Sequence, residues 1–127
     1  GDGMLQNASS LSKIKLPGRL QSIPDHTFRN AVKLENCQIG SGVTKIGNSA
    51  FQGCKKLQRL ILPGQVQTIG KRTFYQCKKL KKVTIRTMQL RKIGKEAYKG
   101  CASKIQFAVP KGKQTAYAKL LKGKYGK

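Results

Sequence analysis

The sequence repeats itself every 23 or 24 residues. Val43–Gln65, VTKIGNSAFQGCKKLQRLILPGQ, recurs as Val66–Gln89 and as Leu90–Pro110, and Leu20–Gly42 is a less regular copy. The aromatic residue of each copy keeps this spacing: Phe28, Phe51, Phe74 and Tyr98. A fixed period of this length is typical of a solenoid, in which each repeat packs mainly against the repeats before and after it.

The period divides the chain into three segments. We expect an α/β solenoid of parallel, stacked short strands and short helical turns over residues 13–110, between a lead-in at residues 1–12 and a C-terminal segment at residues 111–127. The solenoid would consist of one partial and four full repeats: residues 13–19, 20–42, 43–65, 66–89 and 90–110. The lead-in is polar and aperiodic, which is typical of a frayed terminus.

The C-terminal segment has the pattern of a capping helix. Within Gln114–Lys122, the residues Tyr117, Leu120 and Leu121 have the spacing of one apolar helical face. The last repeat of a solenoid needs a cover for its exposed core, and this helix could supply it. The lysines outside that face predict a basic, mobile tail.

Each repeat follows one plan. A short extended stretch such as VTKI points its first and fourth residues inward, and Gly47 or its equivalent then breaks it. A short helical turn follows, for which Asp25 and Asn48 are suited to be N-caps. A strand such as LQRLIL then alternates between core and solvent.

Three of the four cysteines occupy the same position of the repeat. Cys54, Cys77 and Cys101 should therefore stack with parallel side chains, which suits a disulfide poorly. Ala31 holds this position in the first full repeat, as expected of a packing position. We expect buried, reduced thiols, with Cys37 also in the core.

The sequence offers little from which to build an enzyme. Its one histidine, His26, could pair locally with Asp25, but that pair lies where a helix cap belongs. Four scattered carboxylates make no acid/base pair at a suitable spacing. Cysteines about 23 residues apart lack the close spacing of metal ligands. We expect no catalysis, no cofactor and no metal.

The charge is high and uneven. The chain has 27 basic and 4 acidic residues, a formal net charge of +23. Residues 1–42 carry 5 basic and 3 acidic groups (+2), whereas residues 43–127 carry 22 basic and 1 acidic group (+21). Such a field suits an anionic partner, although a solvated surface explains dispersed lysines equally well.

The core residues of the repeat follow the pattern I-G-x-x-A/T-F/Y-x-x-C-x-x-L-x-x-L/V-x-I/L-P. One copy carries it as Ile46, Gly47, Ala50, Phe51, Cys54, Leu57, Leu60, Leu62 and Pro63. The next carries it as Ile69, Gly70, Thr73, Phe74, Cys77, Leu80, Val83 and Ile85. The copy at residues 20–42 departs from it with Pro24 and Ala31.

This pattern closely resembles the BspA-like leucine-rich repeat family of exported bacterial and protozoan surface proteins, over residues 13–110. The resemblance implies a right-handed β/α solenoid, placed at the cell surface or outside the cell. It also implies adhesion to host matrix proteins or to other bacteria as the function. The motif residues would form the core, and binding would fall to the variable positions between them.

Two outward surfaces are candidates for binding. The strand face consists of outward residues of the stacked strands: Lys15, Gln38, Arg59, Ile61, Lys82, Thr84 and Arg86. The lysine rows consist of basic residues on the turns: Lys55, Lys56, Lys71, Arg72, Lys78, Lys79, Lys95 and Lys99.

These surfaces support two function classes. The strand face suits a protein ligand on a host or bacterial surface. The lysine rows suit a polyanion such as a sulfated glycan or a wall polymer. A structural spacer is a third possibility. We expect a monomer without a membrane span, and no sequence-specific recognition of nucleic acid, because the chain shows no nucleic-acid-binding module.

Overall fold

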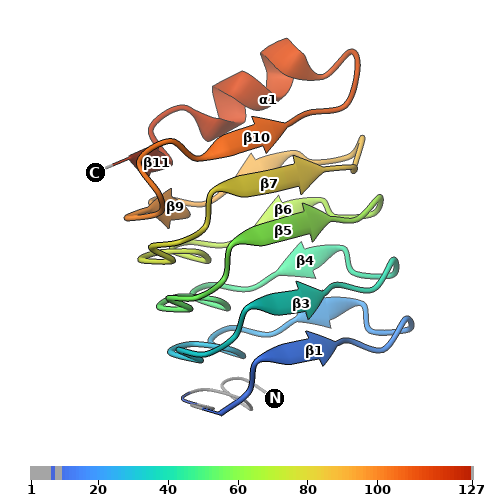
Figure 1. The fold of residues 1–127 in the computed structure, drawn as a ribbon. Helices are drawn as coiled ribbons and strands as arrows, with labels where there is room; N and C mark the ends of the chain where they lie inside the picture. Colours follow the sequence, from blue (N-terminus) through green and yellow to red (C-terminus); the bar gives the residue numbers. More distant parts are fainter. Residues whose placement is uncertain (1–6, 8–9, 127) are drawn as a thin grey trace.

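The chain forms a stack of coils closed at its C-terminal end by a helix (Figure 1). The computed structural model describes residue 7 and residues 10–126, with the backbone alone for residues 125 and 126. Most of the expected lead-in, residues 1–12, therefore lies outside the described residues. Each full coil has three sides, and the parallel solenoid expected from the repeat is confirmed.

The first side of the coils carries the longer strands. They are β1 (Lys13–Lys15), β3 (Asn36–Gln38), β5 (Arg59–Leu62), β7 (Lys82–Ile85) and β10 (Gln106–Ala108). Their residues alternate as expected, because side chains of a strand point to opposite faces. In β5, Leu60 and Leu62 are buried while Arg59 and Ile61 are exposed.

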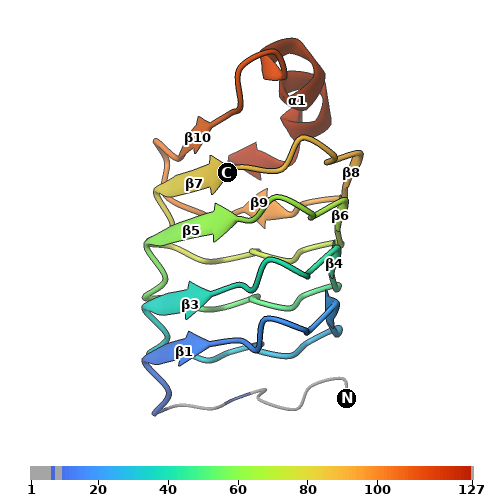
Figure 2. The same cartoon turned by 90° about the vertical axis from the view of Figure 1, so that its right-hand side faces the viewer.

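The second side carries one continuous parallel sheet of two-residue strands. They are β2 (Ser22–Ile23), β4 (Lys45–Ile46), β6 (Thr68–Ile69) and β8 (Lys92–Ile93). Figure 2 shows β4, β6 and β8 one above another along one edge of the stack. The second residue of each strand is a buried isoleucine, so the first residue faces outward.

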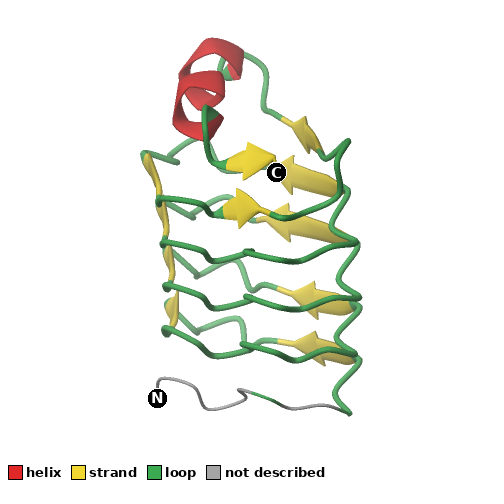
Figure 3. Cartoon of the chain, turned by 90° about the vertical axis from the view of Figure 1, so that its left-hand side faces the viewer, coloured by secondary structure: helices red, strands yellow, loops and turns green. Residues whose placement is uncertain are grey.

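The third side consists of tight turns and not of the short helical turns that we expected. Figure 3 faces this side, which is drawn almost entirely as turns and loops. Each turn contains residues with positive φ, such as His26 (63°) and Ser49 (56°), and an α-helix requires negative φ throughout. The backbone instead bonds to the next coil, with Phe28 N–H donating to the Ala50 carbonyl at 2.7 Å.

The expected N-caps also act between coils. The Asp25 carboxylate accepts a hydrogen bond from the Asn48 backbone N–H at 2.7 Å. The Asn48 side-chain oxygen accepts one from the Lys71 N–H at 2.8 Å. Both amides therefore belong to the following coil and not to the turn that contains the accepting side chain. The expectation of caps within each turn was therefore wrong.

The core is built from equivalent residues stacked on one another. The rings of Phe28, Phe51, Phe74 and Tyr98 have centroids 5.0 to 5.3 Å apart. Beside this stack, the Cys54 thiol donates to the Phe28 carbonyl at 3.2 Å, and the Cys77 thiol donates to the Phe51 carbonyl at 3.0 Å. Both thiols are free and fully buried, which confirms their place in the core, whereas the free thiol of Cys101 in the last coil is only partly buried.

A helix covers the last coil. α1 (Gln114–Leu121) buries Tyr117 and Leu121, and the Tyr117 hydroxyl donates to the Thr87 carbonyl at 2.8 Å. After α1, the backbone of β11 (Tyr125–Gly126) pairs with β9 (Tyr98–Lys99). Within the part of the chain that the structure describes, no helix has the length and apolarity to cross a membrane.

Candidate binding surfaces

The strand face lies on the first side of the coils, where the alternation of the strands turns it outward. Of its seven residues only Thr84 is half-buried, and the others are exposed. The parallel register places Arg59 beside Lys82 and Ile61 beside Thr84. The side chain of Ile61 is 45% exposed, an unusually open position for a large apolar residue in this chain.

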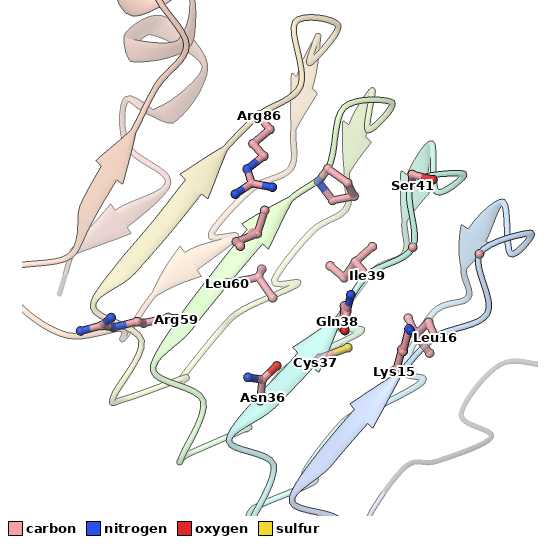
Figure 4. Close-up of a pocket in the computed structure, with 14 residues that line it drawn as sticks. Lys15, Leu16, Asn36, Cys37, Gln38, Ile39, Ser41, Arg59, Leu60 and Arg86 are labelled. Atoms are coloured by element: carbon pink, nitrogen blue, oxygen red, sulfur yellow. The ribbon is translucent and has the colours of Figure 1, made fainter.

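A groove of about 630 Å³ crosses the strand face. Five of the seven predicted residues line it: Lys15, Gln38, Arg59, Ile61 and Arg86. The two remaining residues, Lys82 and Thr84, lie on β7 outside the groove lining. Figure 4 shows the Arg86 guanidinium over β5, while the Arg59 guanidinium lies at the end where β5 begins. The groove therefore combines separated cations with an apolar centre.

The strand ladder is interrupted under this groove. β1 and β3 form one sheet and β5, β7 and β10 form another. Although β3 and β5 are fully described, no backbone hydrogen bond joins them. The Gln38 carbonyl accepts from Leu16 N–H on the β1 side, so the polar backbone groups of Cys37 face β5. The sequence pattern of the two repeats did not predict this interruption.

The lysine rows do not form one surface. Lys71 and Lys95 line a groove on the second side of the coils. Arg72 Nε and Lys99 Nζ make ion pairs with Glu96, at 2.8 and 3.2 Å. These bonds lower the pKa of the Glu96 carboxyl. The other four residues of the rows are exposed on the third side: Lys55, Lys56, Lys78 and Lys79.

The groove on the second side contains basic residues that the sequence analysis missed. It has a volume of about 680 Å³, and four cations outside both predicted surfaces line it: Lys45, Arg91, Lys92 and Lys124. A signal existed in the repeat, since Lys45 and Lys92 both precede a buried isoleucine at the same position. An outward residue was therefore predictable there.

The remaining reactive groups are held in structural roles. Burial raises the pKa of Cys37 and of Cys101 to about 12, so both thiols stay protonated near neutral pH. His26 belongs to a turn, and its backbone N–H donates to the Asn48 carbonyl. Among the described residues, no group of three or more His, Cys, Asp and Glu side chains could hold a metal ion.

Comparison with known proteins gives a consistent assignment of the fold. A family model described as a BspA type leucine-rich repeat region matches six copies over residues 1–124. The chain is similar to a leucine-rich repeat protein from Bacteroides ovatus ATCC 8483, with 28% identity and a TM-score of 0.73 over 84% of this chain. It spans only 28% of that protein.

A second solved structure shares the fold. It is the T. pallidum leucine-rich repeat protein, with 19% identity and a TM-score of 0.72, covering 94% of this chain and 74% of that one. No curated protein matches the sequence.

Proposed function

Since the chain belongs to the BspA type leucine-rich repeat family, we propose that it is a non-catalytic binding module that acts at the cell surface or outside the cell. Leucine-rich repeat proteins generally bind other proteins, and solenoids present extended faces for this purpose. In this proposal the ligand is a protein of a host matrix or of another cell, and the module works in adhesion.

The groove on the strand face supports this proposal more than any other feature. An exposed apolar side chain, Ile61, lies between the cations Lys15, Arg59 and Arg86. Protein interfaces commonly combine an apolar centre with a polar rim, and arginine is enriched in them. A protein segment with an apolar side chain flanked by carboxylates would complement this arrangement.

Binding to a panel of immobilised matrix proteins tests the proposal. We expect one protein to be retained at high salt, because an apolar centre is screened less than charge pairs at the rim. The double variant Ile61→Ser/Arg86→Ala should weaken that binding at least tenfold, as expected for residues at the centre of an interface. The control Lys55→Ala/Lys56→Ala on the third side should bind normally. Equal loss in both variants would refute the assignment to the strand face.

A second candidate function is attachment to an anionic polymer. It is supported by the net charge of +23, of which residues 43–127 carry +21. Such attachment should weaken steeply with salt, because each neutralised anionic group releases counterions. Binding to every polyanion tested, with loss at high salt, would favour this function over protein adhesion.

A further inference from the structure

The groove on the second side of the coils has a regular floor. It lies over β4, β6 and β8 of the continuous sheet, whose outward positions follow one another in register as Lys45, Thr68 and Lys92. Neighbouring strands are about 4.8 Å apart, so Lys45 and Lys92 lie two spacings, or about 10 Å, from each other along the stack. This column of side chains therefore runs along the axis of the solenoid.

A second column of side chains runs beside the first. It contains the residue that follows the proline or glycine after each short strand: Asp25, Asn48, Lys71 and Lys95. The first two use their side chains to hold the next coil, since Asp25 accepts from Asn48 N–H and Asn48 accepts from Lys71 N–H. A lysine side chain has no acceptor for such a bond, and Lys71 and Lys95 are exposed cations at this position.

The two columns make one end of the groove strongly positive. Six cations line the groove: Lys45, Lys71, Arg91, Lys92, Lys95 and Lys124. Asp25 is the one acidic residue of the lining, and it lies in the first coil, away from the coils that carry Lys71 and Lys95. None of the six cations makes an ion pair within the described part of the chain. A concave surface lined by one sign of charge concentrates ions of the opposite sign.

From this arrangement we propose that the groove over β4, β6 and β8 is the binding site for a linear polymer of sulfate or phosphate groups. The polymer would lie along the solenoid axis, with successive anionic groups on Lys45 and Lys92 and on the pair Lys71 and Lys95. The Thr68 hydroxyl, between the two strand lysines, can donate a hydrogen bond to the same chain. This inference deepens the second candidate function and rests on it, but moves its site away from most of the lysine rows.

Paired variants with equal charge test the location of the site. Lys45→Gln/Arg91→Gln/Lys92→Gln removes three charges from the groove, and Lys55→Gln/Lys56→Gln/Lys79→Gln removes three from the third side. Both variants have the same net charge, and all six side chains are exposed, so both should fold. Binding of heparin fragments and of inorganic polyphosphate would be measured by titration calorimetry at several salt concentrations, with circular dichroism as the check on folding.

We expect the groove variant to lose at least tenfold in affinity, with a salt slope smaller by about two, as for three lost contacts. The third-side variant should stay within about twofold of the wild type. Tighter binding of heparin or of polyphosphate would identify the anionic group as sulfate or phosphate. In either case, a loss of affinity confined to the groove variant supports the proposal. Equal losses in both variants would overturn the groove site while leaving polyanion binding in place. Failure of the wild-type protein to bind either probe at low salt would overturn both.

Discussion

Gly94 lies where two coils approach so closely that a side chain cannot fit. A Cβ atom at Gly94 would be 2.5 Å from the Gly70 carbonyl carbon and 2.5 Å from the Lys71 nitrogen. Ordinary contacts begin at 3.4 Å, so the coils would have to separate by about 0.9 Å. Both obstructing atoms belong to the backbone and cannot rotate away.

That separation has a predictable energetic cost. The Gly94 N–H donates to the Ile69 carbonyl at 2.8 Å, and a shift of this size would lengthen the bond beyond hydrogen-bonding distance. Overpacking typically costs about 1–3 kcal/mol, and a lost backbone hydrogen bond adds about 1 kcal/mol. We therefore expect Gly94→Ala to lower the free energy of unfolding by about 2–4 kcal/mol, a large part of the 5–15 kcal/mol typical of a domain.

Urea unfolding followed by circular dichroism measures this effect, and Gly64→Ala provides the control. Nothing lies within 4 Å of a Cβ added at Gly64, and its φ is outside the left-handed region. The control should be neutral or up to about 1 kcal/mol more stable, because alanine restricts the unfolded chain. Identical midpoints for Gly94→Ala and the wild type would refute the reasoning from coil spacing.

Three further predictions concern the core and the cap. Phe51→Ala should cost about 3–5 kcal/mol in urea unfolding, because this fully buried ring stacks on a neighbour at each face; a loss below 1 kcal/mol would contradict it. Tyr117→Phe should cost about 1–3 kcal/mol by leaving the Thr87 carbonyl and the Leu90 N–H without their partner, seen as faster hydrogen exchange around α1. Burial raises the pKa of the Cys37 thiol from 9.0 to about 12. Above pH 9 the unfolded chain therefore loses this proton while the folded protein keeps it, so the free energy of unfolding is at its full value below pH 9 and falls as the pH rises towards 12. Alkylation of Cys37 at pH 8, followed by mass spectrometry, should be slow until urea opens the fold, and equally rapid labelling without urea would contradict this.

Much of the fold was predictable because the repeat fixes which residues share a position. Phe51 and Cys54 recur at one period, and a stack of parallel coils is the simplest way to bury all their equivalents together. The turns were predicted less well, since the three-residue spacing of the aromatic and the cysteine fits a helical turn equally well. The deciding factor was the bonding of each turn to the next coil, which no single repeat reveals.

The candidate sites were predictable only in part. Alternation along β5 placed Arg59 and Ile61 outward, as the structure has them. The interruption between β3 and β5 depends on how two particular coils meet, and their sequences have the same length and similar patterns. Lys45 was not predicted as a site residue because its strand has only two residues, too few to show the alternation that identifies an outward face in β5.

The interrupted ladder also determines where the solenoid would yield under tension. At the β5–β7 junction, backbone hydrogen bonds hold the coils together on all three sides. At the β3–β5 junction, which is fully described, they hold on the second and third sides alone. Bonds that share a load in parallel resist it together, so a junction with fewer of them parts first. Under a pull along the axis, the coils that carry β3 and β5 would therefore part from each other before the coils that carry β5 and β7.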